Sequence, residues 1–384
     1  MSFLASRAGA ILSIDLAALA RNYAFVARHA STAICAAVVK ANAYGLGMVN
    51  IAPALERAGV REFFVAHVDE GLMLRSVISQ QSQITVLHTA TIEAIESCFA
   101  YGLRPVLDSL EQIYWARSIA HQREKHINVA LQIDTGMSRL GLSQNEIKAL
   151  IENPIALDGV SLSLIMSHLA CADTPKHPAN AQQLARFRRY VDLLPRAPLS
   201  LAASSGIFLG EEYHFNLVRP GAALYGVNPC PVHPNPLEAV VHLQARILQT
   251  RVLDKGDCVG YGLTWRAEKP HRVATIGVGY AHGFARHGAT TGCAWFKGYR
   301  LPILGRISMD SMTVDISSVP ENQLQGENKV DLLNKTYGVD DLAKVQGTIG
   351  YEILTSLGRC HHRFYTYNTD YSSKKDEICL QHIS

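Results

Sequence analysis

The stretch that decides the fold is Ala33–Val39 (AICAAVV), an apolar run that ends at Lys40 and continues into the glycine-containing segment Ala41–Gly47 (ANAYGLG). A short apolar run bounded by turn residues predicts a buried strand. Lysine is costly in an apolar core. We therefore expect Lys40 to leave the strand for a polar site at its carboxyl end.

Further runs of the same kind follow in the first half of the chain, and segments with helical periodicity separate most of them. They are Glu62–Ala66, Ile84–His88, Leu103–Leu107, Ile127–Ile133, Val160–Ser167, Leu199–Ala203 and Asn216–Arg219. Asp15 is placed to cap a helix over Leu16–Ala30, and Ser109 with Gln112 predicts the start of another. Eight strands alternating with helices over roughly 230 residues is the repeat of an α/β (β/α)8 TIM-like barrel. A doubly wound open sheet is the alternative, which the strand count disfavours.

The pattern changes after the proline-rich stretch Pro229–Pro236. The β-type runs that follow are Leu243–Val252, Arg272–Val278, Ala294–Phe296, Met312–Ile316 and Lys329–Leu333, with one helix over Val339–Val345. We predict a barrel over residues 1–238 and a mainly β domain over residues 239–384. The polar tail from Asn368 is expected to fray.

Composition excludes several classes of protein. The 384 residues are 48% hydrophobic and 18% charged, with a net charge of +3 and no basic cluster, so nucleic acid is not an expected partner. Apolar runs are too short to span a bilayer, and no secretory signal is recognisable. The eight cysteines form no C-x-x-C pair, and no histidines have metal-ligand spacing with partners. We expect a cytoplasmic enzyme without a metal, and we place His282, His361 and His362 on its surface.

In a barrel of this kind the active site lies at the carboxyl ends of the strands. Burial lowers the pKa of a lysine, which suits Lys40 to act as a Schiff-base nucleophile. The alternative is a lysine that merely reaches solvent, and the glycines and Tyr44 after it disfavour this. The segment Asp134–Gly141 presents Arg139, which suits an anionic oxygen. His168 follows the sixth strand.

Two loops at the ends of the last strands predict a phosphate site. Ala203–Gly206 and Val218–Ala222 follow the seventh and eighth strands, where barrels often bind phosphate. Gly221 permits close approach of the backbone, and successive N–H groups with a serine hydroxyl suit a dianion. Both loops opposite a strand-end lysine point to pyridoxal phosphate.

Several motifs, taken together and in order, resemble those of bacterial alanine racemases over nearly the whole chain. They are VVKANAYGLG (Val38–Gly47), DTGMSRLG (Asp134–Gly141), MSHLACAD (Met166–Asp173), RPGAALYG (Arg219–Gly226), VGYGLTW (Val259–Trp265), VGYAHGF (Val278–Phe284), GRISMDSMTVD (Gly305–Asp315) and GTIGYEILT (Gly347–Thr355). The motifs of the second half are the more specific, because other barrel enzymes that use this cofactor share the lysine motif loosely.

The resemblance implies a role for each matching residue. Lys40 and Tyr261 would be the two catalytic bases, with Tyr261 offered by the partner subunit of a homodimer. Arg219 would face the pyridine nitrogen of the cofactor, and His168 would link this arginine toward the tyrosine. Arg139 and the backbone N–H of Met309 would bind the substrate carboxylate. The phosphate-binding set would be Tyr44, Ser205, Gly221, Ala222 and Tyr351, and Tyr280 would line the path of the substrate.

The chain departs from the family pattern at Gln132. Many members carry there a lysine whose carbamate holds the arginine equivalent to Arg139. Glutamine forms no carbamate, so a neutral amide, alone or with a bound anion, is expected to orient Arg139. This departure leaves Lys40 and Tyr261 untouched.

The function that the resemblance implies is racemisation of alanine, which would supply D-alanine for peptidoglycan. A barrel-type amino-acid decarboxylase is the second hypothesis, although decarboxylases of this type pair the pyridine nitrogen with a carboxylate rather than with an arginine such as Arg219. A non-catalytic carrier of pyridoxal phosphate is the third, and such proteins resemble the barrel alone.

Overall fold

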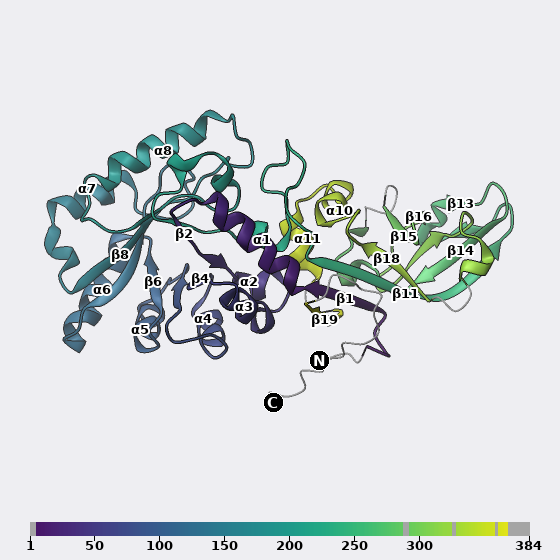
Figure 1. Cartoon of the computed structure of the whole chain (residues 1–384), viewed down its shortest axis with the longest axis horizontal. Coiled ribbons are helices and arrows are strands. Elements are labelled where there is room, and N and C mark those ends of the chain that lie inside the picture. Colours follow the sequence, from purple (N-terminus) through teal and green to yellow (C-terminus); the bar gives the residue numbers. More distant parts are fainter. Residues whose placement is uncertain (1–4, 287–291, 325–327, 358–359, 368–384) are drawn as a thin grey trace.

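The structure, a computed structural model, describes residues 5–286, 292–324, 328–357 and 360–367. The predicted frayed tail, Asn368–Ser384, lies outside the described residues. The chain forms a barrel and an elongated β domain, and long strands run from the β domain to the barrel (Figure 1).

The barrel strands are parallel and follow one another in chain order. The order is β3 (Ala37–Val38), β4 (Glu62–Val65), β5 (Gln83–Val86), β6 (Arg104–Leu107), β7 (Ile127–Gln132), β8 (Val160–Met166) and β9 (Leu199–Ser200). β10 (Leu217–Val218) pairs with β2 (Ile34–Cys35), and the bridge between Ala203 and Arg219 links it to the strand before. Because β2 and β3 are two halves of the first predicted run, all eight predicted strands are present and the predicted barrel is confirmed.

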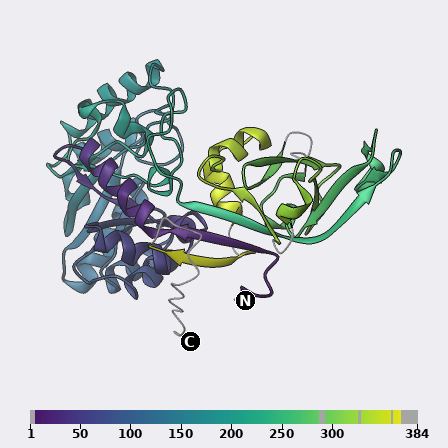
Figure 2. The same cartoon turned by 45° about the vertical axis from the view of Figure 1, so that its right-hand side comes forward.

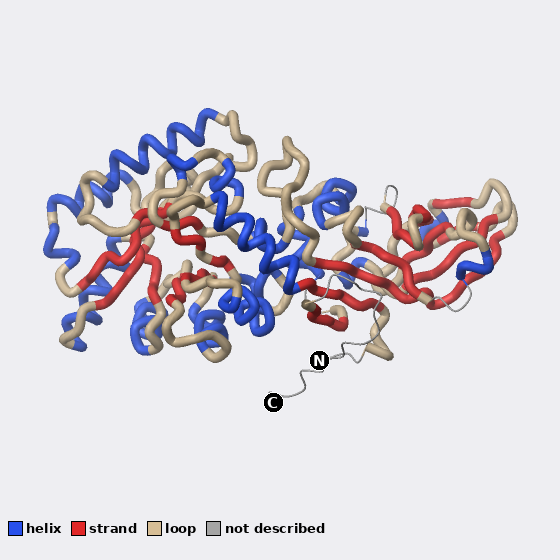
Figure 3. The backbone as a smooth tube through the Cα atoms, in the orientation of Figure 1, coloured by secondary structure: helices blue, strands red, loops and turns tan. Residues whose placement is uncertain are grey.

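Helices cover the outside of these strands (Figure 3). They are α1 (Leu16–His29), α3 (Met48–Arg57), α4 (Val68–Arg75), α5 (Ile92–Ala100), α6 (Leu110–Arg123), α7 (Gln144–Glu152) and α8 (Pro178–Val191). The short segment α2 (Lys40–Tyr44) instead follows β3 at its carboxyl end. Short 3-10 turns complete the barrel: η1 (Pro154–Leu157), η2 (Ser205–Phe208), η3 (Glu211–Tyr213) and η4 (Ala222–Tyr225). Asp15 caps α1 as predicted, since its carboxylate accepts the N–H groups of Ala17 and Ala18 at 2.9 Å.

An eight-stranded sheet forms the second domain, in the order β14-β17-β16-β15-β18-β11-β1-β19. Its strands are β1 (Ala10–Asp15), β11 (Val241–Leu253), β14 (His271–Ile276), β15 (Cys293–Phe296), β16 (Tyr299–Leu304), β17 (Met312–Asp315), β18 (Lys329–Leu333) and β19 (His362–Thr366). The hairpin of β12 (Cys258–Val259) and β13 (Trp265–Arg266) lies at its far end (Figure 1). The remaining elements are η5 (Tyr261–Leu263), η6 (Tyr280–His282), α9 (Glu321–Leu324), α10 (Val339–Gln346) and α11 (Gly350–Leu357).

Strand β1 belongs to this second sheet although it precedes the barrel in the sequence. Leu12 lies opposite Leu243 of β11 and opposite Arg363 of β19, and Figure 2 shows β1 between these two strands. The prediction of surface positions was wrong for His361, which is buried and lies against the carbonyl of His282 at 3.2 Å.

Candidate active site

Lys40 stands at the carboxyl end of the first barrel strand, as its sequence pattern predicts. It is half-buried, and it interacts electrostatically with Arg139, Arg219 and Glu70. Burial lowers the pKa of Lys40, and the two arginines lower it further, whereas Glu70 raises it. The lowered pKa favours the neutral amine, which is the form that attacks a carbonyl carbon or accepts a proton.

The backbone after Lys40 forms a left-handed turn. Ala41, Asn42 and Ala43 have φ values of 53°, 55° and 54°, a region that costs about 1–2 kcal/mol for each residue with a Cβ. Specific hydrogen bonds hold this turn. The Glu70 carboxylate accepts the N–H of Asn42 at 3.1 Å, and the Asn42 side-chain oxygen accepts the N–H of Met48 at 2.8 Å. Strain kept in place by surrounding contacts is typical of functional sites.

Arg219 and His168 lie beside Lys40 in the interior of the barrel mouth. Arg219 is only 4% exposed, and its guanidinium donates to the carbonyl of Ser167 at 2.6 Å and to the hydroxyl of Ser200. Burial lowers the pKa of Arg219 to about 10, so it remains cationic at neutral pH. Burial, with Arg219, Arg139 and Lys40, lowers the pKa of His168 to about 3, so this imidazole remains neutral.

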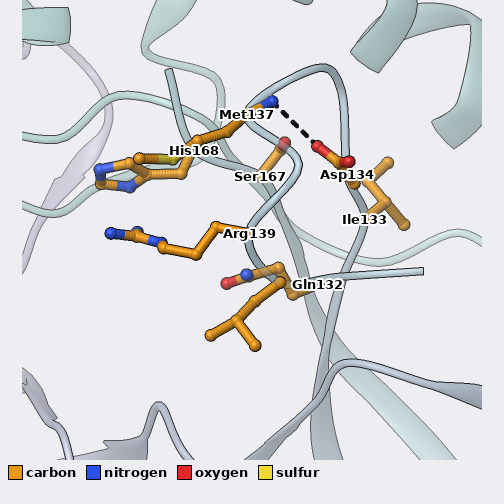
Figure 4. Close-up of a pocket in the computed structure, with 8 residues that line it drawn as sticks. Gln132, Ile133, Asp134, Met137, Arg139, Ser167 and His168 are labelled. Carbon is orange, nitrogen blue, oxygen red and sulfur yellow. Dashed lines mark hydrogen bonds between the residues drawn. The ribbon is translucent and has the colours of Figure 1, made fainter. Parts of the chain in front are cut away.

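A small hollow at the barrel mouth brings Arg139 together with Gln132 and His168. Figure 4 shows these three side chains pointing the same way, whereas the Asp134 carboxylate points to the backbone nitrogen of Met137. The Asp134 carboxylate accepts the N–H groups of Gly136 and Met137 at 2.8 and 3.0 Å, which closes the loop that carries Arg139.

The two predicted phosphate loops form a cradle. The Ser204 hydroxyl accepts the N–H groups of Gly221 and Ala223 at 3.0 and 3.2 Å. A Cβ on Gly221 would lie 2.3 Å from the Tyr44 hydroxyl, so only glycine lets these groups approach. Ala222 begins η4 directly after this point. The sequence argument did not single out Ser204, although Ser204 belongs to the same predicted loop.

Helix α11 of the β domain completes the cradle. Its Tyr351 forms a side-chain hydrogen bond with Ser205, and its ring lies 6.1 Å from the ring of Tyr44. Burial raises the pKa of both tyrosines, so their hydroxyls stay protonated and can donate to an anion. The helix also packs on Gly45, where a Cβ would lie 2.7 Å from the carbonyl of Leu354.

The remaining predicted residues lie on the β domain, away from Lys40 of the same chain. Tyr261 and Met309 are 67% and 59% exposed. Tyr261 begins η5, between β12 and β13, and Figure 1 places β13 at the opposite end of the β domain from α2. The loop that carries Met309 contacts two neighbouring loops. The N–H of Ala281 donates to the Met309 carbonyl at 2.8 Å, and Gly260 lies so close to Arg306 that a Cβ on it would be 3.2 Å from the Arg306 backbone. The structure thus divides the predicted site into two groups. The barrel-mouth group contains Lys40, Arg139, His168, Arg219 and the cradle residues, and the distal group contains Tyr261 and Met309.

The barrel-mouth group defines a class of protein: a (β/α)8 barrel with a strand-end lysine beside cationic groups and a cradle of N–H and hydroxyl donors. This donor set fits a phosphorylated aldehyde, with the phosphate in the cradle and the aldehyde at Lys40. Among the described residues, no group of three His, Cys, Asp or Glu side chains is arranged to hold a metal ion.

Comparisons with known proteins identify the family. Residues 14–229 match the alanine racemase N-terminal domain, and residues 240–365 match the alanine racemase C-terminal domain. The catabolic alanine racemase of Mesorhizobium japonicum is 49% identical over 93% of both chains, and the alanine racemase of Brucella ovis is 43% identical over 94% of both. The crystal structure of Bartonella henselae alanine racemase with covalently bound pyridoxal phosphate has a TM-score of 0.88 and 40% identity, covering 93% of this chain and 99% of that one. The chain therefore belongs to the alanine racemase family, which confirms the predicted family and fold.

Proposed function

We propose that this protein interconverts L- and D-alanine by a two-base mechanism, with Lys40 of one subunit and Tyr261 of its partner on opposite faces of the substrate. Family membership makes the chain a pyridoxal-phosphate-dependent racemase. The observation that carries the proposal is the half-buried Lys40 at a barrel mouth, facing Arg139 and Arg219 beside the cradle at Gly221.

The cofactor would be held at both of its ends by residues described above. Lys40 would bind the aldehyde and Arg219 would face the ring nitrogen. The phosphate would lie among the hydroxyl and N–H donors of Tyr44, Ser204, Ser205, Gly221, Ala222 and Tyr351. When bound, pyridoxal phosphate spreads the negative charge that forms when the α-proton leaves.

Lys40 is suited to the proton on one face, because its lowered pKa favours the neutral amine. We assign it the proton of D-alanine. Tyr261 would take the proton of L-alanine, and a tyrosine needs nearby positive charge to act as a base. His168 cannot supply that charge, because its pKa is held near 3. The charge must come from the arginines, with His168 as a neutral link to Arg219.

The substrate carboxylate would be bound by Arg139 and by the backbone N–H of Met309. Met309, like Tyr261, belongs to the distal group, so it too would come from the partner. The exposed side chains of Tyr261, Leu263 and Met309 would become buried if a second copy of the chain docked on them. A homodimer with shared active sites therefore explains both the exposure of the distal group and its separation from Lys40.

One assay on the purified protein separates the hypotheses. With L-alanine, a racemase loses optical rotation without releasing carbon dioxide, a decarboxylase releases carbon dioxide, and a carrier does neither. The described residues provide no carboxylate within ion-pairing distance of Arg219, which disfavours the decarboxylase. The matching C-terminal domain disfavours the carrier. Release of carbon dioxide, or no turnover of holoenzyme, would contradict the proposal.

The physiological direction of the reaction is a separate proposal. Two enantiomers have equal free energy, so the reaction that consumes the product sets the direction. The expected supply of D-alanine for peptidoglycan competes with a degradative role, which the names of two relatives favour: the catabolic alanine racemases of Mesorhizobium japonicum and Agrobacterium fabrum, 49% and 48% identical. Deleting the gene from its host distinguishes them, because a need for added D-alanine supports the first role and poor growth on alanine as the carbon source supports the second.

The structure bears on the location of the protein through its helices. No helix in the described segments has both the length and the apolar character needed to cross a membrane. A cytoplasmic location remains a prediction from the sequence.

A further inference from the structure

Arg139 is exposed at the barrel mouth, and its predicted partner Gln132 is neutral. Gln132 is buried in β7 and lines the same hollow as Arg139. Among the described residues, Arg139 has no carboxylate within 4.0 Å. Without a partner to fix it, the Arg139 side chain can rotate into solvent at little cost in free energy.

Two carboxylates near this hollow, those of Asp134 and Glu70, already accept hydrogen bonds from backbone N–H groups. Asp134 accepts N–H groups of its own loop, including that of Gly136 at 2.8 Å. Glu70 accepts the N–H groups of Asn42 and Ala66 at 3.1 and 2.8 Å. Neither carboxylate is free to turn toward Arg139.

Asp108 is the exception. It directly follows β6, where Leu107 lies opposite Leu131 of β7, so continuing the register by one residue sets Asp108 beside Gln132. Its Oδ1 atom is buried and has no hydrogen-bond partner in the described part of the chain. Arg139 is the charged group that interacts with this carboxylate. A buried carboxylate oxygen without a donor is costly, which points to a partner that it meets in the working enzyme.

We propose that Asp108 is a positioning residue for Arg139, whose carboxylate holds the guanidinium at the barrel mouth where it meets the carboxylate of the substrate. This inference rests on the proposed function, because it takes Arg139 as the group that binds that carboxylate. The negative charge that Gln132 cannot provide comes from the neighbouring strand.

The first test compares holoenzyme variants with propionate, a carboxylate that lacks the reacting amine. Asp108→Asn should raise the KM for L-alanine and the Kd for propionate, measured by calorimetry, by about 3- to 30-fold, the range for directly coupled residues. The kcat should change less than KM, and Asp108→Glu should restore part of the affinity. Glu111→Gln is the matched control, because it removes an exposed carboxylate in the first turn of α6, three residues after Asp108, and it should change neither constant.

A double-mutant cycle and a pH series add readouts that a merely structural role would not change. In an Arg139→Ala background, Asp108→Asn should have no further effect on propionate binding. Burial raises the pKa of Asp108 to about 7 against the lowering effect of Arg139. Parent enzyme should therefore bind propionate more weakly as pH falls from 8 to 6, and Asp108→Asn should not follow this trend. The other titratable groups facing Arg139 are Lys40, His88 and His168, whose pKa values are all lowered.

The outcomes separate this inference from the proposed function. If the parent enzyme fails to racemise alanine, the proposed function fails. If it racemises alanine but Asp108→Asn binds propionate equally well or more tightly, or the cycle is additive, the role of Asp108 is refuted. Circular dichroism checks folding, and Asp108→Ser replaces the asparagine variant if that variant does not fold.

Discussion

Lys40 combines three properties that rarely occur together: it ends an apolar strand, it is half-buried, and it faces two arginines. Lys40→Ala should abolish the covalent attachment of the cofactor, because Lys40 is the lysine of the barrel-mouth group. The visible absorption band of the bound cofactor measures this. A small added amine should restore part of the activity if Lys40 also acts as a base, and an unchanged band in the variant would contradict its role.

Asp108 makes a separate prediction about stability. The ionised carboxylate is disfavoured in the folded state, because burial raises its pKa from 3.8 to about 7. The unfolded chain releases this proton more readily, so the contribution of Asp108 to stability falls as pH rises from about 4 to 7. Asp108→Asn should thus stabilise the protein at pH 8, by about 1 °C in Tm for each kcal/mol gained in a chain of this length.

Thermal unfolding of the parent enzyme and the Asp108→Asn variant at pH 8 and pH 5 tests this prediction. The advantage of the variant should shrink at the lower pH, where Asp108 of the folded parent is protonated. A variant less stable than the parent at pH 8 would show that the carboxylate has a stabilising partner. A more stable but weaker-binding variant would be a trade of stability for function.

The sequence predicted some site residues from their position directly after a strand, but it did not predict Asp108. Lys40 could be found because a charged residue after an apolar run is expected to leave the core for a polar site. Arg219 stays buried, and only the resemblance of Arg219–Gly226 to the family motif gave it a role. Asp108 follows the run Leu103–Leu107 in the same way, and the rule applied there would have found it. Ser204 could not be separated from Ser205 by sequence pattern, since only the backbone shows which hydroxyl faces the N–H of Gly221.

At the scale of single elements, the turn after Lys40 shows what local pattern misses. The glycines at 45 and 47 predict a tight turn, and both have positive φ. The left-handed conformation begins earlier, at Ala41, where a side chain disfavours it. Its cause is tertiary, because Glu70 from α4 and Leu354 from α11 fix the segment from either side.

The cradle between η2 and η4 depends on one glycine. Gly221 has a φ of −125°, so space rather than backbone strain requires glycine here. Gly221→Ala would place its Cβ 2.3 Å from the hydroxyl of Tyr44, whose ring lies 4.9 Å from the ring of Tyr225 and 6.1 Å from that of Tyr351. The variant should bind pyridoxal phosphate at least about tenfold more weakly, a loss of about 1.4 kcal/mol.

Reconstitution of the apoenzyme with increasing cofactor, followed by absorbance, measures this affinity. Gly338→Ala is the matched control, because Gly338 has a φ of −92° and its nearest foreign atom would lie 4.0 Å from the new Cβ. Equal affinity of the Gly221 variant and the control would show that Tyr44 moves aside without consequence for the phosphate.

At the scale of the whole molecule, the sequence predicted the barrel and a mainly β domain but not how they join. β1 is separated from its partners β11 and β19 by more than two hundred residues of chain. No strand is predicted before Ala33, because the apolar run that ends at Asp15 is short, and such a run holds no information about which sheet it enters. The position of α11 could not be predicted either, because its Tyr351 reaches the cradle only through the contact between α11 and α2.

The arrangement of the two residue groups leads to the prediction about assembly. Each chain carries Lys40 at the start of α2 and Tyr261 in η5, next to β13, and Figure 1 places α2 and β13 at opposite ends of the β domain. A two-base site therefore needs two copies of the chain. Lys40→Ala and Tyr261→Ala should each lose activity, by roughly 10²- to 10⁴-fold for a general base. Unfolding and refolding the two inactive proteins together should restore activity, because one site of a mixed dimer has both residues intact.

The recovered activity should approach one quarter of the parent value. Random mixing makes about half of the dimers mixed, and each mixed dimer has one intact site of its two. Refolding each variant alone is the control, and it should recover nothing. Differently tagged subunits show whether mixed dimers form. If mixed dimers form and remain inactive, each chain supplies both bases itself, and the β domain must then move far enough to bring its own Tyr261 to Lys40. If activity returns, the exposed distal group is one half of an active site that only dimerisation completes.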